Sequence, residues 1–326
     1  MDHVRMIIGS TPMKKIARQK LKGHWLESAA VFIVYLIFTQ GLSQLFLNSK
    51  RNVDVDIETL LSQNLVSLVS IALILGLLTF FLAPPILVGG TKYILKLIRD
   101  EDAKFSDIFY GFTCYWRGFK QYFLFNLIIT LPILILIAIG IIITSSISQR
   151  VDSLLLSILV IIMILFLVWI VYAVVLKIGL LFKFFVIADE KFQYNGAIDS
   201  LKTCYSMMSG NKAHLFGIIL SFIGWYLLAI LPGSIFAAVV PSDTALIWGN
   251  VLTLIPLSFV TAYAYATFAV YYRILRGELK IDIVDEEPQE IHREISKEIV
   301  RKESHEEITK EARVESPENE EDKTLK

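Results

Sequence analysis

The chain has few charged residues and few cysteines for its length. Of its 326 residues, 19% are charged and 55% belong to the hydrophobic set, whereas soluble domains carry about 25% charged and about 45–50% apolar residues. It has two cysteines, Cys114 and Cys204, too few for the disulfide scaffold of a small secreted protein. This composition argues against an ordinary soluble enzyme and indicates a membrane protein.

Catalytic motifs are also missing from the sequence. It contains no Walker phosphate-binding loop, no Gly-x-Ser-x-Gly nucleophile elbow and no His-Glu-x-x-His metal motif. His24 and His214 each lie beside an apolar stretch, but neither has a His or Cys at metal-binding spacing. We therefore expect a non-enzymatic protein without a catalytic site, metal site or cofactor, and without a nucleic-acid partner.

Six long stretches contain no Asp, Glu, Lys or Arg: 28–49, 59–91, 121–149, 153–176, 213–242 and 244–272. A helix needs roughly 20 apolar residues to cross the hydrocarbon core of a membrane, and each stretch exceeds this length. None shows the alternation of a membrane strand, and helices satisfy their own backbone hydrogen bonds in lipid. The sequence therefore predicts an all-α polytopic membrane protein of six transmembrane helices, at about 25–47, 65–88, 121–144, 154–176, 213–236 and 246–271.

Lys and Arg lie almost entirely on one side of these predicted spans. The segments 1–27, 89–120, 177–212 and 273–280 hold twenty of them, whereas the alternate segments 48–64, 145–153 and 240–245 hold three. Because short cytoplasmic loops are enriched in Lys and Arg, we expect both termini in the cytoplasm. Both cysteines would then face a reducing compartment as free thiols.

The segments between the spans resemble one another. Ile98-Arg99-Asp100-Glu101 and Ile187-Ala188-Asp189-Glu190 are each followed by a Thr-Cys-Tyr triplet and a lysine at the next span, and Arg276-Gly277-Glu278 ends the last span in a similar way. The pattern predicts three parallel helical hairpins, each a basic interfacial helix followed by an outgoing and a returning span. Chance similarity in a biased composition is the alternative. The acidic pairs at 100–101 and 189–190 are interpreted as solvated turns.

Three segments, 12–22, 104–117 and 192–209, are too polar to span and are predicted to lie at the membrane interface. Within the second, the aromatic and aliphatic residues of 105–112 share one helical face. Basic residues of such helices lie near anionic headgroups. The candidate lipid-headgroup contacts in and beside these segments are Lys14, Lys15, Lys22, Lys104, Arg117, Lys120, Lys177 and Lys212.

Five prolines are candidate helix-break positions: Pro84, Pro85, Pro132, Pro232 and Pro256. Pro132 and Pro256 fall near the middle of their spans, where interrupted helices form the binding sites of many transporters. Proline is also tolerated in membrane helices generally, so a simple packing kink is the alternative.

The sequence divides into a basic leader (1–24) with an interfacial helix, a six-span domain (25–277) and an acidic tail (278–326). The tail holds 17 acidic and 9 basic residues. We expect a solvated helix over 289–312 and disorder beyond Pro317. The tail's charge is opposite to that of the basic loops, so docking there and binding a basic protein partner are both hypotheses.

Several motifs resemble a known family. They are Leu21-Lys22-Gly23-His24-Trp25, Gly90-Thr91-Lys92-Tyr93, Phe105-Ser106-Asp107-Ile108-Phe109-Tyr110-Gly111-Phe112, Ala197-Ile198-Asp199-Ser200-Leu201-Lys202 and Ser221-Phe222-Ile223-Gly224-Trp225. In this order they resemble the bacterial integral membrane family catalogued as domain of unknown function 975, over about residues 12–278. The resemblance implies a multi-pass protein of the bacterial plasma membrane. It implies no substrate, cofactor or catalytic residue.

Two functions remain open on the sequence alone. The first is a non-enzymatic membrane protein that engages lipids or other amphiphiles through its basic interfacial helices, as an accessory in envelope homeostasis. The alternative is a small-molecule or peptide exporter with a midplane site at the kinks of Pro132 and Pro256.

Overall fold

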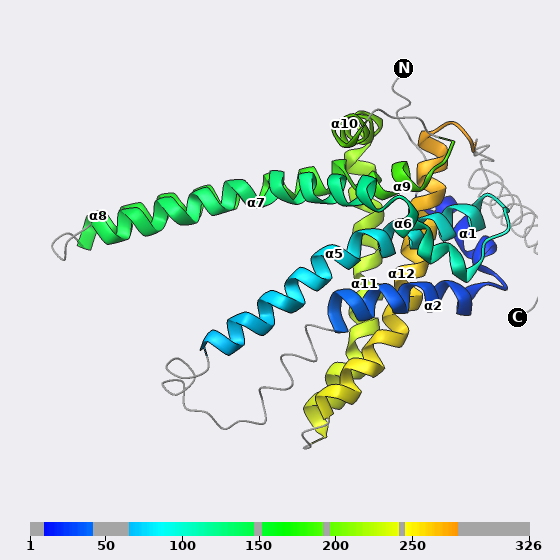
Figure 1. Ribbon diagram of the computed structural model, residues 1–326, viewed down its shortest axis with the longest axis horizontal. Coiled ribbons are helices and arrows are strands. Elements are labelled where there is room, and N and C mark those ends of the chain that lie inside the picture. Colours follow the sequence, from blue (N-terminus) through cyan, green and yellow to red (C-terminus); the bar gives the residue numbers. More distant parts are fainter. Residues whose placement is uncertain (1–9, 42–64, 147–151, 192–195, 241–244, 280–326) are drawn as a thin grey trace, which may run out of the picture. The chain divides into compact units, whose positions relative to one another are not determined.

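All regular elements in the described part of the chain are helices. The computed structural model describes residues 10–41, 65–146, 152–191, 196–240 and 245–279 (Figure 1). The chain divides into two units, 1–279 and 280–326. The second unit lies outside the described residues, and with it the predicted tail helix and the tail's contacts. The predicted all-α class is confirmed for the first unit.

Within the described residues, five helices are long and apolar enough to cross a membrane. They are α5 (Leu65–Ile98), α7 (Tyr115–Ser146), α8 (Asp152–Gly179), α11 (Lys212–Val239) and α12 (Ala245–Leu275). Each contains one of the predicted spans and continues past it. In α5 this extension covers the segment after residue 88, where Lys92 and Lys96 carry charge at the end of the helix.

The first predicted span, 25–47, is described only in part. Helix α2 (Trp25–Leu36) continues into the π-helical turn η1 (Ile37–Gly41), and the remaining residues lie outside the described part. Helix α1 (Ser10–Leu21) precedes α2. The pair is bent by 101° and is a sixth candidate span if its two arms are counted together.

Three short helical elements occupy the polar segments between the long helices. They are the 3₁₀ turn η2 (Phe105–Phe109), α6 (Tyr110–Thr113) and α10 (Ala197–Met207). Each packs on a long or returning helix: η2 and α6 on α5, and α10 on α7 and on α9 (Lys183–Ala188), the short helix after α8. In the same way α1 packs on α12. These elements therefore bury one face against protein.

Glycines let the backbones of η2 and α6 lie directly against the backbone of α5. A Cβ added at Gly89 of α5 would lie 1.9 Å from the carbonyl oxygen of Ile108, and one added at Gly111 would lie 1.8 Å from that of Pro85. Gly233 of α11 likewise faces Gly249 of α12, where an added Cβ would lie 2.1 Å from the Gly249 carbonyl oxygen. Small residues at helix crossings let backbones approach closely, as is usual in membrane proteins.

The five candidate helix-break prolines lie inside long helices, and the kinks predicted at them stay predictions. Pro84 and Pro85 lie inside α5, Pro132 inside α7, Pro232 inside α11 and Pro256 inside α12. A proline removes one backbone donor, but a membrane helix can continue when neighbouring groups satisfy the freed carbonyl. Pro84 and Pro85 are also buried, so packing against η2 and α6 holds this stretch in place.

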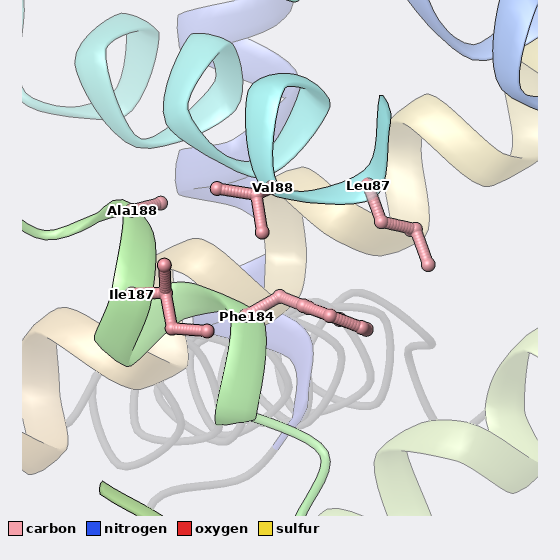
Figure 2. Close-up of a cluster of buried hydrophobic side chains, with 5 residues drawn as sticks. All are labelled: Leu87, Val88, Phe184, Ile187 and Ala188. Carbon is pink, nitrogen blue, oxygen red and sulfur yellow. The ribbon is translucent and has the colours of Figure 1, made fainter. Parts of the chain in front are cut away.

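A cluster of buried hydrophobic side chains lies where α5 meets α9. Leu87 and Val88 from α5 contact Phe184, Ile187 and Ala188 from α9, and Figure 2 shows the side chains of the two helices meeting. Helix α12 packs against α1, α2, α5 and α11. By contrast, 11% of the most apolar 18-residue stretch of α7 is buried, and 6% of that of α8. These two helices therefore present apolar side chains outward.

Candidate functional site

The ends of α5, α9 and α12 meet around the guanidinium group of Arg99. Its Nη1 and Nη2 donate to the two carboxylate oxygens of Asp189, at 2.9 and 3.0 Å. Its Nε and Nη2 also donate to Glu278, at 3.1 and 2.7 Å. Arg99 thus binds two carboxylates bidentately, the geometry in which a planar guanidinium pairs most strongly.

Further residues of α12 complete this arrangement. The Tyr272 hydroxyl donates to Asp189 Oδ2 at 3.1 Å, and Arg273 Nη1 donates to the Ile98 carbonyl at the end of α5, at 2.6 Å. Arg276 Nε lies 3.8 Å from a carboxylate oxygen of both Asp189 and Glu278. We call Arg99, Asp189, Tyr272, Arg273, Arg276 and Glu278 the arginine network.

Burial makes the arginine network electrostatically strong. The side chains of Asp189 and Arg99 are 0% and 7% exposed. Burial alone would raise the pKa of Asp189, but hydrogen bonds from Arg99 outweigh it and hold that pKa below its usual value. Burial likewise opposes the charge of Arg99, yet its hydrogen bonds to Asp189 and Glu278 raise its pKa. Both groups therefore stay ionised.

This geometry corrects the interpretation of Asp189 as a solvated turn residue. Asp189 is buried under α5 and α12, whereas Asp100, Glu101 and Glu190 are exposed. These three form ion pairs nearer the surface: Asp100 with Lys20, Glu101 with Lys191 at 3.0 Å, and Glu190 with Lys92 at 2.6 Å. Exposed pairs of this kind contribute about 0–1 kcal/mol each.

Helices α5 and α12 end in the same backbone motif. The N–H of Glu101 donates to the Lys96 carbonyl and that of Asp100 to Leu97, while Glu278 and Gly277 repeat this with Arg273 and Ile274. Asp100 and Gly277 have φ angles of +59° and +70°. This is the Schellman motif, which satisfies the last carbonyls of a helix. Arg99 thus occupies the same position in its motif as Arg276, and Glu101 the same position as Glu278.

A second group of cations lies at the adjacent ends of α8, α9 and α11. Lys183 Nζ lies 3.4 Å from the centroid of the Phe125 ring, and Lys212 Nζ lies 3.7 Å from that of Tyr205. Lys177, six residues before Lys183, lies within electrostatic range of it. Among the described residues, none of these three lysines forms an ion pair with a carboxylate. We call Lys177, Lys183 and Lys212 the lysine cluster.

The last residue of α8, Gly179, contacts α10 beside the lysine cluster. A Cβ added at Gly179 would lie 2.9 Å from the Tyr205 ring and 3.5 Å from Lys212 Cε. The Cys204 thiol donates to the Gly179 carbonyl at 3.7 Å. Burial raises the pKa of this thiol to about 12, although nearby Lys183 acts in the opposite direction.

The other predicted headgroup contacts are spread over the ends of the helices. Lys15, Lys22, Lys104, Arg117 and Lys120 are exposed, and Lys104 pairs with Asp102 at 2.8 Å. Lys14 is partly buried, with its Nζ 4.7 Å from the Phe222 ring. The structure therefore brings together only Lys177 and Lys212 of the predicted set. It adds Lys183. In the sequence this lysine is one of several basic residues of the segment 177–212, and no motif marks it as a site residue.

The whole arrangement falls within a region that matches a known family. A family model described as "Protein of unknown function (DUF975)" matches residues 6–278. The chain belongs to this family. The DUF975 match covers both the arginine network and the lysine cluster, and the resemblance seen in the sequence motifs is thereby confirmed. No curated protein and no solved structure matches the chain.

Proposed function

We propose that this DUF975 protein is a non-enzymatic protein of the bacterial cytoplasmic membrane that binds anionic lipid headgroups at the charged ends of its helices. Both termini would lie in the cytoplasm, where the inner leaflet carries anionic lipid. The protein would serve as an accessory in envelope homeostasis.

The lysine cluster is the observation that carries this proposal. Three lysines gather where α8, α9 and α11 meet, two of them with an aromatic ring under the ammonium group, and none forms an ion pair with a carboxylate among the described residues. Cations grouped in this way favour an anion, and the aromatic faces add cation–π stabilisation to two of the lysines. Lys177 and Lys183 lie in the second half of the candidate span Val160–Ala188, and Lys212 is the first residue of the candidate span Lys212–Val239. A lipid phosphate at the membrane surface has the charge and depth to fit the cluster.

Exposed aromatic side chains near other predicted headgroup contacts support the same role. Phe105, Phe109 and Phe112 are 43%, 60% and 44% exposed, and Trp116 is 67% exposed. They lie between Lys104 and Lys120 in the sequence. Ile108, in the same segment, turns inward and is buried. A surface with aromatic rings beside cations is typical of the boundary between water and lipid.

Helix packing supports the proposal of three parallel hairpins. The short elements before the second and third outgoing helices pack on the return helix before them, η2 and α6 on α5 and α10 on α9, while α1 packs on α12. The outgoing helices follow the same rule, with α7 on α5, α11 on α8 and α2 on α12. Three repeated units would give this pattern.

The exporter alternative is less favoured. It places a midplane site at the kinks of Pro132 and Pro256, but the stretches 121–149 and 244–272 that contain these prolines hold no Asp or Glu to couple an ion. Replacing both prolines with alanine should leave lipid binding intact. A loss of substrate export on that replacement would instead support the exporter.

The test of the lipid role is retention of phosphatidylglycerol by purified protein, measured by native mass spectrometry. We expect the triple variant Lys177→Gln/Lys183→Gln/Lys212→Gln to retain at least about tenfold less, since about 1 kcal/mol per headgroup-contacting lysine exceeds a factor of ten over three residues. The matched control, Lys20→Gln/Lys92→Gln/Lys191→Gln, removes the same charge from lysines that already pair with carboxylates and are not candidate headgroup contacts. Equal retention by the two variants would contradict the proposal.

A further inference from the structure

We propose that Arg99, Arg273 and Arg276 form a binding site for a phosphate-class anion, and that Glu278 occupies this site as an exchangeable internal ligand. The proposed site uses the arginine network and shares no residue with the lysine cluster. It therefore stands or falls separately from the lipid role proposed above.

The Glu278 carboxylate lies among three guanidinium groups from two helix ends. One oxygen lies 2.7 Å from Arg99 Nη2 and 3.8 Å from Arg276 Nε, and the other lies 3.1 Å from Arg99 Nε and 3.5 Å from Arg273 Nε. Bidentate contact by a planar guanidinium fits phosphate oxygens as well as carboxylate oxygens. The position of Glu278 is thus one that a phosphate group can take.

The two carboxylates of the arginine network are held very differently. Asp189 is 0% exposed and receives hydrogen bonds from both Arg99 and Tyr272. Glu278 is 24% exposed and lies three residues beyond the end of α12, after Gly277. Removal of Asp189 would open the packing between α5, α9 and α12, whereas Glu278 can turn outward by side-chain rotation. Asp189 is therefore the fixed partner of Arg99, and Glu278 is the exchangeable one.

Charge explains why an anion would replace Glu278. Without it, three arginines and one aspartate leave a net charge of about +2 on groups of low exposure, and an uncompensated buried charge is costly. Arg99 is 7% exposed and Arg273 is 17% exposed. The Nε atom of Arg273 is buried and makes no hydrogen bond to any described residue. A phosphate group carries up to two negative charges. Its acceptor oxygens are enough to bind Arg273 Nε and also the two Arg99 nitrogens that now donate to Glu278.

Two sources offer this chemistry, a free phosphate ion and the phosphate of an anionic lipid headgroup. The experiment therefore has two arms on full-length purified protein. In the first, binding of radiolabelled inorganic phosphate is measured by equilibrium dialysis in a neutral detergent. In the second, retention of phosphatidylglycerol is compared with that of phosphatidylcholine by native mass spectrometry.

The decisive variant is Glu278→Gln, which removes the internal anion and keeps the side-chain shape. If Glu278 occupies the site nine-tenths of the time or more, its removal raises the apparent affinity about tenfold or more in at least one arm. The matched control is Glu101→Gln, which makes the same charge change at the equivalent position of α5, where the glutamate pairs with Lys191. We expect the control to leave both arms unchanged. Adding Arg276→Gln to Glu278→Gln should abolish the gain.

Each outcome of this experiment has a definite meaning. A gain with free phosphate alone identifies a soluble anion, and a gain with phosphatidylglycerol alone identifies a lipid headgroup; either supports the site. Equal gains in Glu278→Gln and Glu101→Gln would show a general charge effect and overturn it. So would no gain in either arm, provided that the melting temperature of Glu278→Gln shows a folded protein. Should that variant not fold, Arg276→Gln alone must weaken anion binding at least about threefold, and unchanged binding would overturn the site.

Discussion

Arg99 and Asp189, 90 residues apart in the sequence, form two parallel hydrogen bonds of 2.9 and 3.0 Å in a buried position. This pair joins the end of α5 to the end of α9, and Tyr272 of α12 donates to the same aspartate. The ends of α5, α9 and α12 are thus connected through a single carboxylate. The stability of the charged end of the molecule should therefore depend strongly on this pair.

Removing one partner of the pair tests this dependence. Asp189→Ala leaves Arg99 buried without its fixed carboxylate, so we expect a loss of about 3–5 kcal/mol in the free energy of unfolding. Replacing both partners, Arg99→Met/Asp189→Leu, should cost less than Asp189→Ala, because no buried charge is left uncompensated. Denaturant unfolding in detergent measures both. A double variant less stable than the single one would contradict this account.

The same pair predicts the response to acid. The pKa of Asp189 is lower in the folded protein than in the unfolded chain, because the effect of burial is outweighed by hydrogen bonds from Arg99. Its contribution to stability is therefore complete above the unfolded pKa of about 3.9 and is lost as pH falls through the folded pKa. Below about pH 4, the melting temperature of the wild type should fall more steeply than that of Asp189→Asn. Glu190→Gln, at a largely exposed ion pair, should follow the wild type.

Gly89 tests the close crossing between α5 and η2. Gly89→Ala would place a Cβ within 1.9 Å of the Ile108 carbonyl oxygen, so backbone must move and we expect a loss of about 3 kcal/mol or more. Gly76→Ala is the matched control in the same helix, because no atom lies within 4 Å of its added Cβ. That change should be neutral or stabilise by up to about 1 kcal/mol. Similar melting temperatures for the two variants would rule out the crossing.

Substitutions at the two equivalent helix ends should change the stability of the protein in opposite directions. Gly277 has a φ of +70°, so Gly277→Ala should destabilise the protein by about 1 kcal/mol. Asp100 adopts a φ of +59° without being glycine, so Asp100→Gly should relieve strain and stabilise by up to about 1 kcal/mol. The lost ion pair with Lys20 is partly exposed and costs little. Thermal melting of the two variants checks both signs.

The cysteines test both burial and topology. Cys204 is 0% exposed and its thiol pKa is raised to about 12 by burial, so a maleimide at pH 7.5 should label it only after unfolding. Cys114 is only partly buried, so it should label measurably faster, although burial also raises its pKa. The variants Cys114→Ser and Cys204→Ser report the two sites separately. In intact cells, an impermeant maleimide should label neither, and labelling of Cys114 from outside would contradict cytoplasmic loops.

The long helices were predictable because their signal is local. A stretch of about 20 residues without charge has few stable states in lipid other than a helix, and α5, α7, α8, α11 and α12 contain the predicted spans. The helix ends were less predictable. The extension of α5 to Ile98 depends on packing against η2 and α9, which the charge pattern at Lys92 and Lys96 does not reveal.

The sequence by itself determined the helical class, the separation of apolar helices from charged ends, and the family. Tertiary structure alone decided which charges are neutralised and which are not. Asp189 and Glu190 are neighbours of the same type, yet Asp189 is buried under Arg99 while Glu190 lies in an exposed pair with Lys92. Likewise, Lys183 is a site residue because its ammonium group lies over the ring of Phe125, 58 positions earlier in the chain. Ion pairing and desolvation depend on distances between segments, and the order of residues along one segment does not contain those distances.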